Sequence, residues 1–304
     1  MAVSGTPATT VPKHSLAFNL LTSLRPGQWT KNLLVFAALL FGRLLFDPAA
    51  VAEATVAFAI FCALSGSVYL VNDIADRDID RRHPLKAQRP LASGALPVGV
   101  AVGAAAVLIG GSLAAAFVVS QRFGWVAAGY LALLTLYSVT LKHIVILDVL
   151  TISIGFVLRA VAGAFAIDVE ISQWLLVCTI LLALFIALAK RRHELVLLAD
   201  GATGHRPILG EYSAYLLDQM IAVVTASTLV AYIFYTISPE TQQKFGTTLL
   251  ELTIPFPIYG IFRYLYLVHR REGGGSPAEL LLTDRPLLTC VALWALSVAL
   301  IIYR

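Results

Sequence analysis

Apolar stretches long enough to cross a membrane recur along the whole sequence. A transmembrane α-helix needs about 20 predominantly apolar residues to cross about 30 Å of hydrocarbon. Hydrophobic residues make up 59% of the chain and charged residues only 13%, about half of the roughly 25% charged that is typical of soluble domains. This pattern predicts an all-α integral membrane protein. We expect nine transmembrane helices, at residues 31–46, 51–72, 96–119, 124–141, 144–167, 172–190, 211–237, 247–269 and 285–303.

No break in composition divides the sequence after its polar start. The first residues, which include SGTPATTVPK, are small and polar, so we expect residues 1–24 to form a disordered cytoplasmic tail. Residues 25–304 are expected to form a single nine-helix transmembrane domain. The three cysteines each lie in an apolar stretch without metal-ligand spacing, which favours a packing role.

Basic residues are unequally distributed between the two sets of predicted loops. If the N-terminus is cytoplasmic, the cytoplasmic loops hold most of the 22 Lys and Arg residues, as the positive-inside rule requires. We therefore expect a multi-pass protein whose N-terminus is cytoplasmic. The cations expected on the opposite side are Arg43, Arg122, Lys244 and Arg304.

The segment VNDIADRDIDRRHP (71–84) places four aspartates directly after an apolar stretch. In a helix that turns about 100° per residue, Asp73, Asp76 and Asp80 share a face about 60° wide. Asn72 lies near that face, whereas Asp78 points elsewhere. Clustered carboxylates repel one another unless a cation lies between them, and their hard oxygens suit Mg²⁺ bound to substrate phosphates. The alternative is a solvated loop in which acidic and basic charges neutralise one another.

Cations flank the acidic segment on both sides in the sequence. Lys86 and Arg89 follow it, and guanidinium and ammonium groups are suited to bind phosphate oxygens. Arg25, Gln28 and Lys31 lie earlier, in RPGQWTKN, and are further candidates for substrate binding. For Lys31 the alternative is a topological anchor at the membrane surface.

The acidic pattern Asn72-Asp73-x-x-Asp76-x-x-x-Asp80 resembles the first aspartate-rich motif of the UbiA prenyltransferase superfamily. The resemblance implies a nine-helix bundle with a cytoplasm-facing active-site cavity. It implies that Asp73, Asp76 and Asp80 are catalytic residues that bind Mg²⁺ and diphosphate. The segment YSVTLKH (137–143) resembles a Tyr/Lys element of the same family, which makes Tyr137 and Lys142 candidates for the site.

One departure from the family pattern is informative. Prenyl-transferring members carry a second DxxxD motif after helix 6, but this sequence has ALAKRRHELVLL there. The segments RPGQWTKNLLVFAALLF, KRRHEL and YLLDQM resemble the decaprenyl-phosphate phosphoribosyltransferase branch. That resemblance implies a pentosyltransferase of the bacterial inner membrane. Lys190 and Arg191 are then candidates for the 5-phosphate or the acceptor phosphate, although Lys190 can also pair with Glu194 on the helix surface.

Two further ionisable residues lie in or near the fifth predicted span. Arg159 lies well inside it, where a charge is costly and functional by default. This arginine either holds the lipid phosphate or pairs with Asp218 or another acid. Asp148, near the start of the span, either contacts the ribose hydroxyls, orients Lys142, or is an acid favoured by the helix dipole.

The branch implies a specific reaction and specific partners. It transfers 5-phosphoribose from phosphoribosyl diphosphate to a polyprenyl (decaprenyl) phosphate, with Mg²⁺ as cofactor, and the product serves cell-wall arabinan synthesis. The alternative enzyme is a prenyltransferase that moves an isoprenoid from its diphosphate to an aromatic or other acceptor. A transporter is disfavoured because the ionisable residues crowd one surface rather than the midplane. We expect contact with membrane lipids and no nucleic-acid partner. The sequence leaves open whether the protein forms a homo-oligomer.

Overall fold

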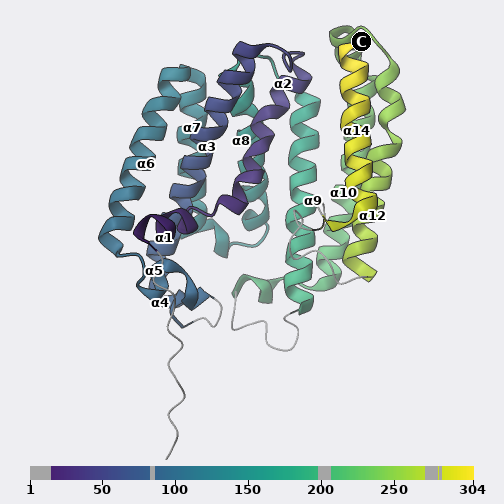
Figure 1. The fold of residues 1–304 in the computed structure, drawn as a ribbon. Coiled ribbons are helices and arrows are strands. Elements are labelled where there is room, and N and C mark those ends of the chain that lie inside the picture. The colour runs from purple at the N-terminus through teal and green to yellow at the C-terminus, as the bar shows by residue number, and fades with distance from the viewer. Residues whose placement is uncertain (1–14, 83–85, 198–206, 271–279, 281–282) are drawn as a thin grey trace, which may run out of the picture. The chain divides into compact units, whose positions relative to one another are not determined.

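The computed structural model describes residues 15–82, 86–197, 207–270, 280 and 283–304, and this part of the chain contains helices and no strand (Figure 1). Its α-helices are α1 (Leu16–Ser23), α2 (Ala37–Phe41), α3 (Pro48–Ala75), α4 (Arg77–Asp80), α5 (Pro90–Ser93), α6 (Val98–Val119), α7 (Gln121–Val139), α8 (Leu147–Ala166), α9 (Gln173–Leu197), α10 (Ala214–Ile237), α11 (Pro239–Phe245), α12 (Pro255–Arg270) and α14 (Arg285–Tyr303). The 3-10 helices are η1 (Pro26–Phe36), η2 (Lys86–Gln88), η3 (Leu141–His143), η5 (Pro207–Glu211) and η6 (Leu249–Thr253).

The chain divides into two compact units. Unit 1 comprises residues 1–30 and 62–112, and unit 2 comprises residues 31–61 and 113–304. In unit 1, α1 and α4 both pack on α5. The core of unit 1 is formed by buried residues of α3, α5 and α6 and of the segment between α5 and α6, namely Leu70, Leu91, Leu96, Ala101 and Ala105.

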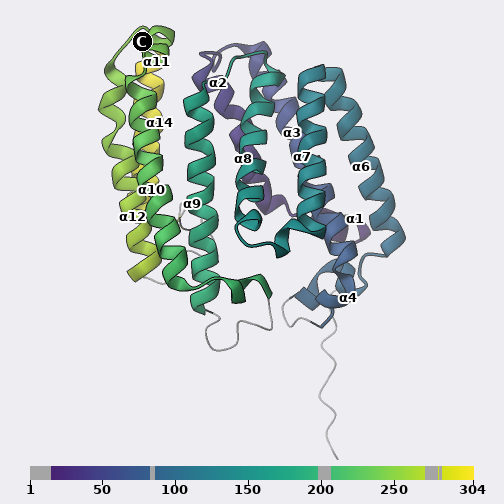
Figure 2. The same cartoon turned by 180° about the vertical axis from the view of Figure 1, so that it is seen from behind.

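The helices of unit 2 follow one another as neighbours. α7 packs on α8, α8 on α9 and α9 on α10, and α12 packs on α14 (Figure 2). Polar residues begin several of these helices, as N-caps do. Ser120, Ser213 and Asp284 each accept a hydrogen bond from a backbone N–H in the first turn of α7, α10 and α14.

Six helices in the described residues are long and apolar enough to cross a membrane, and a bent pair of segments makes a seventh candidate. The six agree closely with spans expected from the sequence: Pro48–Ala75, Val98–Val119, Leu147–Ala166, Gln173–Val196, Ala214–Ile237 and Arg285–Tyr303. The bent pair, Pro239–Phe245 and Leu249–His269, turns by 104°, so the expected helix at 247–269 is continuous only from Pro255. The protein is therefore a multi-pass helical membrane protein.

The first expected span, residues 31–46, differs most from the prediction. It is not one α-helix: residues 26–36 form η1, and only Ala37–Phe41 are α-helical. A 3-10 helix of 11 residues is long for this conformation, and contacts in unit 2 hold it. The Asn32 side chain accepts a hydrogen bond from Arg159, and the Val35 backbone lies against Gly163 of α8.

The expected disordered tail, residues 1–24, is helical in the part that the structure describes. Residues 16–23 form α1, which Ser15 caps by accepting the N–H of Phe18. Two of its side chains are bonded within unit 1: Asn19 donates to the carbonyl of Ala95, and Ser23 donates to the carbonyl of Asn19. Residues 1–14 of the expected tail lie outside the described residues.

The turn after α2 is joined to the end of α14 within unit 2. Arg43, with φ of 62°, donates from Nε to the carbonyl of Ile302 at 2.9 Å. The Tyr303 hydroxyl donates to the carbonyl of Leu39 and accepts the N–H of Leu45. Carbonyls at the end of a helix lack partners within it and favour cations, so Arg43 caps α14.

We expect Gly163→Ala to destabilise the protein, because a Cβ at this position would overlap the Val35 carbonyl group. Forcing extra atoms into a packed site costs about 1–3 kcal/mol. Gly155→Ala on the same helix is the matched control, since its Cβ would meet only ordinary van der Waals contacts of 3.5 Å and longer. Thermal unfolding in detergent would measure the difference, and equal melting temperatures would contradict the close approach.

Candidate active site

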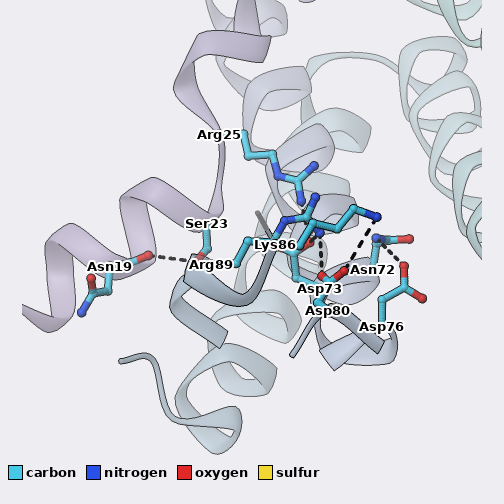
Figure 3. Close-up of polar contacts among 9 residues, drawn as sticks. All are labelled: Asn19, Ser23, Arg25, Asn72, Asp73, Asp76, Asp80, Lys86 and Arg89. Carbon is cyan, nitrogen blue, oxygen red and sulfur yellow. Dashed lines mark hydrogen bonds and ion pairs between the residues drawn. The ribbon is translucent and has the colours of Figure 1, made fainter. Parts of the chain in front are cut away.

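The predicted acidic cluster lies in unit 1, at the end of α3 and in α4 (Figure 3). Asp73 belongs to the last turn of α3 and Asp80 to the end of α4, and both side chains are 3% exposed. Asp76 separates the two helices, with φ of −89° and ψ of 3°, although its N–H bonds to the carbonyl of Asn72 and the N–H of Asp80 bonds to the carbonyl of Asp76. Asp73 and Asp80 lie together across this junction, as the spacing predicts, since both carboxylates contact Arg89.

Arginine side chains bind the two buried carboxylates. Nη1 of Arg89 lies 3.1 Å from Oδ1 of Asp73 and 2.6 Å from Oδ2 of Asp80. Nη2 of Arg25 lies 2.5 Å from Oδ1 of Asp73, and Nζ of Lys86 lies 3.9 Å from Oδ1 of Asp80. Figure 3 shows these cations converging on the carboxylates. Two aspartates thus share a single guanidinium nitrogen, which shows that their oxygens can converge on one cation.

The third predicted metal ligand points to a different partner. Oδ2 of Asp76 accepts a hydrogen bond from Nδ2 of Asn72 at 3.0 Å, and Asp76 is half-buried. Asp78 is 83% exposed and lies 3.6 Å from Arg81, so it points away from the cluster as predicted. Among the described residues, no three Asp, Glu, His or Cys side chains are gathered as a metal site.

The backbone explains how the flanking cations reach the cluster. Arg25 has φ of 52° at the junction between α1 and η1, and its guanidinium also lies 4.6 Å from the centre of the Tyr69 ring. Arg89 is extended and immediately precedes Pro90, the first residue of α5. Proline favours both an extended preceding residue and the first helical position. Gln28 is exposed.

A second cluster lies in unit 2, where α8, α9 and the segment before α10 meet. Asp148 is fully buried and accepts hydrogen bonds from Nε of Arg191 at 2.9 Å and from the Tyr212 hydroxyl at 2.7 Å. Nη1 of Arg191 also donates to Glu194 at 2.7 Å. Arg191 is 3% exposed, and the two carboxylates balance its buried charge. No sequence motif marks Tyr212 as part of this cluster.

The other predicted residues of this part of unit 2 are more accessible. Lys190 is 47% exposed and lies 3.9 Å from Glu194, so the helix-surface pair weighed from the sequence is present. Lys142 is half-buried in η3, and Tyr137 is half-buried near the end of α7. Lys31 is half-buried in η1. Burial, together with the hydrogen bond to Asp148, raises the pKa of Tyr212 to about 12, so its hydroxyl stays protonated.

Arg159 is buried within α8 among uncharged groups. Its Nε donates to Oδ1 of Asn32 at 2.7 Å, its Nη1 to the carbonyl of Gly155 at 2.9 Å, and its Nη2 to the hydroxyl of Tyr130 at 2.6 Å. The guanidinium also lies 4.8 Å from the Tyr130 ring centre and 5.1 Å from that of Phe156. These contacts join η1, α7 and α8.

The pairing of Arg159 with Asp218 that the sequence left open is not formed. Asp218 instead accepts hydrogen bonds from Arg192, the shorter at 2.5 Å, and lies 3.3 Å from His269. The side chain of Asp218 is 35% exposed. Arg192, the third cation of KRRHEL, is therefore a partner of α10 rather than part of the Asp148 cluster.

The fold and these clusters define a multi-pass helical membrane protein with paired carboxylates and cations at its helix ends. The family model described as "UbiA prenyltransferase family" matches residues 32–278. The chain belongs to the UbiA prenyltransferase family, which confirms the resemblance found in the motifs.

Similar proteins include two curated relatives and a solved structure. The decaprenyl-phosphate phosphoribosyltransferase of Mycolicibacterium smegmatis is 34% identical over 308 residues, which cover 97% of this chain and 96% of the relative. The protein of the same name from Corynebacterium glutamicum is 32% identical and covers 96% and 89%. A UbiA homologue from Archaeoglobus fulgidus, solved with GPP and Mg²⁺, superposes with a TM-score of 0.72 at 20% identity, covering 94% of this chain and 100% of that one. This last likeness is one of fold.

Proposed function

We propose that this protein transfers 5-phosphoribose from phosphoribosyl diphosphate to a polyprenyl phosphate and releases diphosphate. The observation that carries the proposal is the run of three cations at the end of α9, Lys190, Arg191 and Arg192. Prenyl-transferring members of the family have a second acidic motif at this place. Here Glu194 and Asp148 are both bonded to Arg191, and Lys190 and Arg192 lie beside it. The names of the relatives that match nearly the whole chain support the same reaction.

The residues of the acidic cluster in unit 1 fit Mg²⁺. Their donors are hard carboxylate and amide oxygens, which magnesium prefers, and Asp73 and Asp80 already converge on one cationic nitrogen. We assign Asp73, Asp76 and Asp80 to the metal, with Asn72 beside them. When bound, Mg²⁺ would clamp the diphosphate and stabilise it as a leaving group. The flanking cations suited to the diphosphate oxygens are Arg25, Lys86 and Arg89, with Gln28 as a further polar contact.

The transfer forms one bond and breaks another at C1 of ribose. An oxygen of the acceptor phosphate bonds to C1, the C1–O bond to diphosphate breaks, and its electron pair leaves with the diphosphate. A phosphate is already ionised at neutral pH, so no strong general base is needed. The protein's contribution is positioning and charge neutralisation.

Basic residues of unit 2 are assigned by their charge and exposure. Lys31, Lys142 and Lys190 are half-buried or exposed cations, suited to the 5-phosphate or the acceptor phosphate, with Tyr137 as a neighbouring polar contact. Arg191 and Asp148 neutralise each other, so we assign them to holding the end of α9. Arg159 bonds only uncharged groups in the described structure, so we assign it to holding η1 rather than to the lipid phosphate.

The membrane arrangement is part of the proposal. Adding η1 with α2 and α7 to the seven candidates gives nine crossings, and we assign residues 25–304 to a single catalytic domain. The excess of cations in alternate loops supports a cytoplasmic N-terminus and a cytoplasm-facing active-site cavity. The location proposed is a bacterial inner membrane, and the product would feed arabinan synthesis in the cell wall.

We expect purified protein to consume phosphoribosyl diphosphate and decaprenyl phosphate only when Mg²⁺ is present. Diphosphate release and the mass of the lipid product measure the reaction, and EDTA should stop it because the leaving diphosphate loses its metal. Geranyl diphosphate with an aromatic acceptor is the matched control for the prenyltransferase alternative. Turnover of that pair alone, or of neither pair, would overturn the proposal.

A further inference from the structure

The turn between η3 and α8, in unit 2, contains a strained residue. Ile146 has φ of 70°, a region that β-branched residues rarely occupy because their side chain clashes with the backbone. Ile146 precedes α8, and the carbonyl of this residue accepts the N–H of Leu150 in the first turn. Such strain persists only where surrounding contacts enforce it, so the residues that hold Ile146 identify what the turn depends on.

Tyr212 provides that hold from a distant part of the chain. Its hydroxyl accepts the N–H of Ile146 at 2.8 Å and donates to Oδ1 of Asp148 at 2.7 Å. Tyr212 is 5% exposed and packs in one core cluster with Val145, Val149 and Ile208. One hydroxyl therefore fixes the turn on both sides of Leu147.

The held turn carries Lys142. Only three residues lie between this lysine and Ile146, and η3 is closed by hydrogen bonds from the N–H groups of His143 and Ile144 to the carbonyls of Thr140 and Leu141. A segment so short has little freedom once its end is fixed, so the angle at which the chain enters α8 sets the position of Lys142. η3 also packs against η5, the segment that leads to Tyr212.

We infer that Tyr212 is a positioning residue that holds the turn at Ile146 and thereby sets Lys142 for binding of a substrate phosphate. Tyr212 touches no substrate in this role and acts through the backbone of residues 141–146. The part concerning phosphate rests on the proposed function, whereas the hold on the turn does not.

Two other buried tyrosines of unit 2 provide matched controls. The Tyr232 hydroxyl also has two partners, Thr253 at 2.6 Å and the indole N–H of Trp294 at 2.8 Å, but these belong to η6 and α14. The Tyr264 hydroxyl is buried without a hydrogen-bond partner among the described residues. Replacing each tyrosine by phenylalanine removes the same atom from three different environments.

The experiment compares Tyr212→Phe, Tyr232→Phe and Tyr264→Phe in the full-length protein in lipid nanodiscs. Hydrogen–deuterium exchange of peptides covering residues 141–150 reports the turn, and steady-state kinetics reports the substrates. Tyr212→Phe should speed exchange in this segment and raise KM about tenfold for the one substrate whose phosphate Lys142 binds, phosphoribosyl diphosphate or decaprenyl phosphate, the factor expected for one lost hydrogen bond. KM for the other substrate should stay unchanged, as should exchange and both KM values in the two controls.

The outcomes separate this inference from the proposed function. Unchanged exchange at residues 141–150 in Tyr212→Phe would overturn the inference. KM values for both substrates equal to those of Tyr264→Phe would also overturn it. If the wild-type protein does not use phosphoribosyl diphosphate, the proposed function fails, and the exchange result still decides the role of Tyr212 at the turn. If Tyr212→Phe does not fold, fast exchange of the Ile146 amide in the wild type overturns the inference and slow exchange supports it.

Discussion

Replacing Asp73 or Asp76 by alanine should abolish turnover at saturating Mg²⁺, a loss of at least about a thousandfold. Each substitution removes an oxygen ligand from the proposed metal and diphosphate site. Asp78→Ala in the same segment is the control, because Asp78 is 83% exposed and points away from the cluster. Diphosphate release under saturating donor and acceptor measures the effect.

The two substitutions also test different contacts. Asp73→Ala removes the partner of Arg25 and Arg89, so a folding defect has to be separated from a chemical one. Asp73→Asn keeps the size of the side chain and removes the charge, and circular dichroism and thermal unfolding check that the variant folds. Normal rates in Asp76→Ala or in a folded Asp73→Asn would remove these residues from the site.

Arg191→Leu should lower the free energy of unfolding by about 3–5 kcal/mol, the cost typical of leaving a buried charge without its partner. The uncompensated group is Asp148, which is fully buried. Arg192→Leu is the control on the same helix, because its partner Asp218 is 35% exposed and can be hydrated. Thermal unfolding in one detergent compares the two variants.

A double variant sharpens this test. Adding Asp148→Asn to Arg191→Leu removes the stranded charge, so it should recover part of the lost stability. Such non-additivity is expected for residues in direct contact. Additive losses, or an equal loss in Arg192→Leu, would show that the Asp148–Arg191 pair does not have the importance proposed for it.

The sequence predicted most of the long helices because an apolar stretch of about 20 residues can be recognised from neighbouring residues alone. It failed at residues 31–46, where tertiary contacts decide the backbone. Apolar residues there suit an α-helix, but the bond from Arg159 to Asn32 and the approach of Val35 to Gly163 hold a 3-10 helix. No pattern within that segment reveals contacts that arise more than 120 residues later.

The acidic segment was predictable in part for the same reason. Helical angles correctly brought Asp73 and Asp80 to one face and sent Asp78 away. They could not show that Arg25 and Arg89 would bind these carboxylates, because those arginines lie 48 and 16 residues from Asp73. The pairing of Asp76 with Asn72 is local, and a side-chain donor four residues earlier was the available signal for it.

Tyr212 was missed because nothing in its neighbourhood marks it. It lies 64 residues from Asp148 and 66 from Ile146, and a tyrosine before a helix is unremarkable in a membrane protein. The usable signal was Asp148 itself: a buried carboxylate needs partners, and polar residues at the start of α10 were among the few available. Sequence alone could pose that requirement but not choose the partner.

The bond between Arg43 and Ile302 bears on the order in which the protein can be completed during synthesis. Chains emerge from the ribosome N-terminus first, so the turn at residues 43–45 is made long before α14 exists. Until α14 emerges, the N–H of Leu45 and the carbonyl of Leu39 lack the Tyr303 hydroxyl as their partner. The contacts between the turn after α2 and α14 can therefore form only after the other described helices of unit 2 have been synthesised, so α14 completes the packing of this turn.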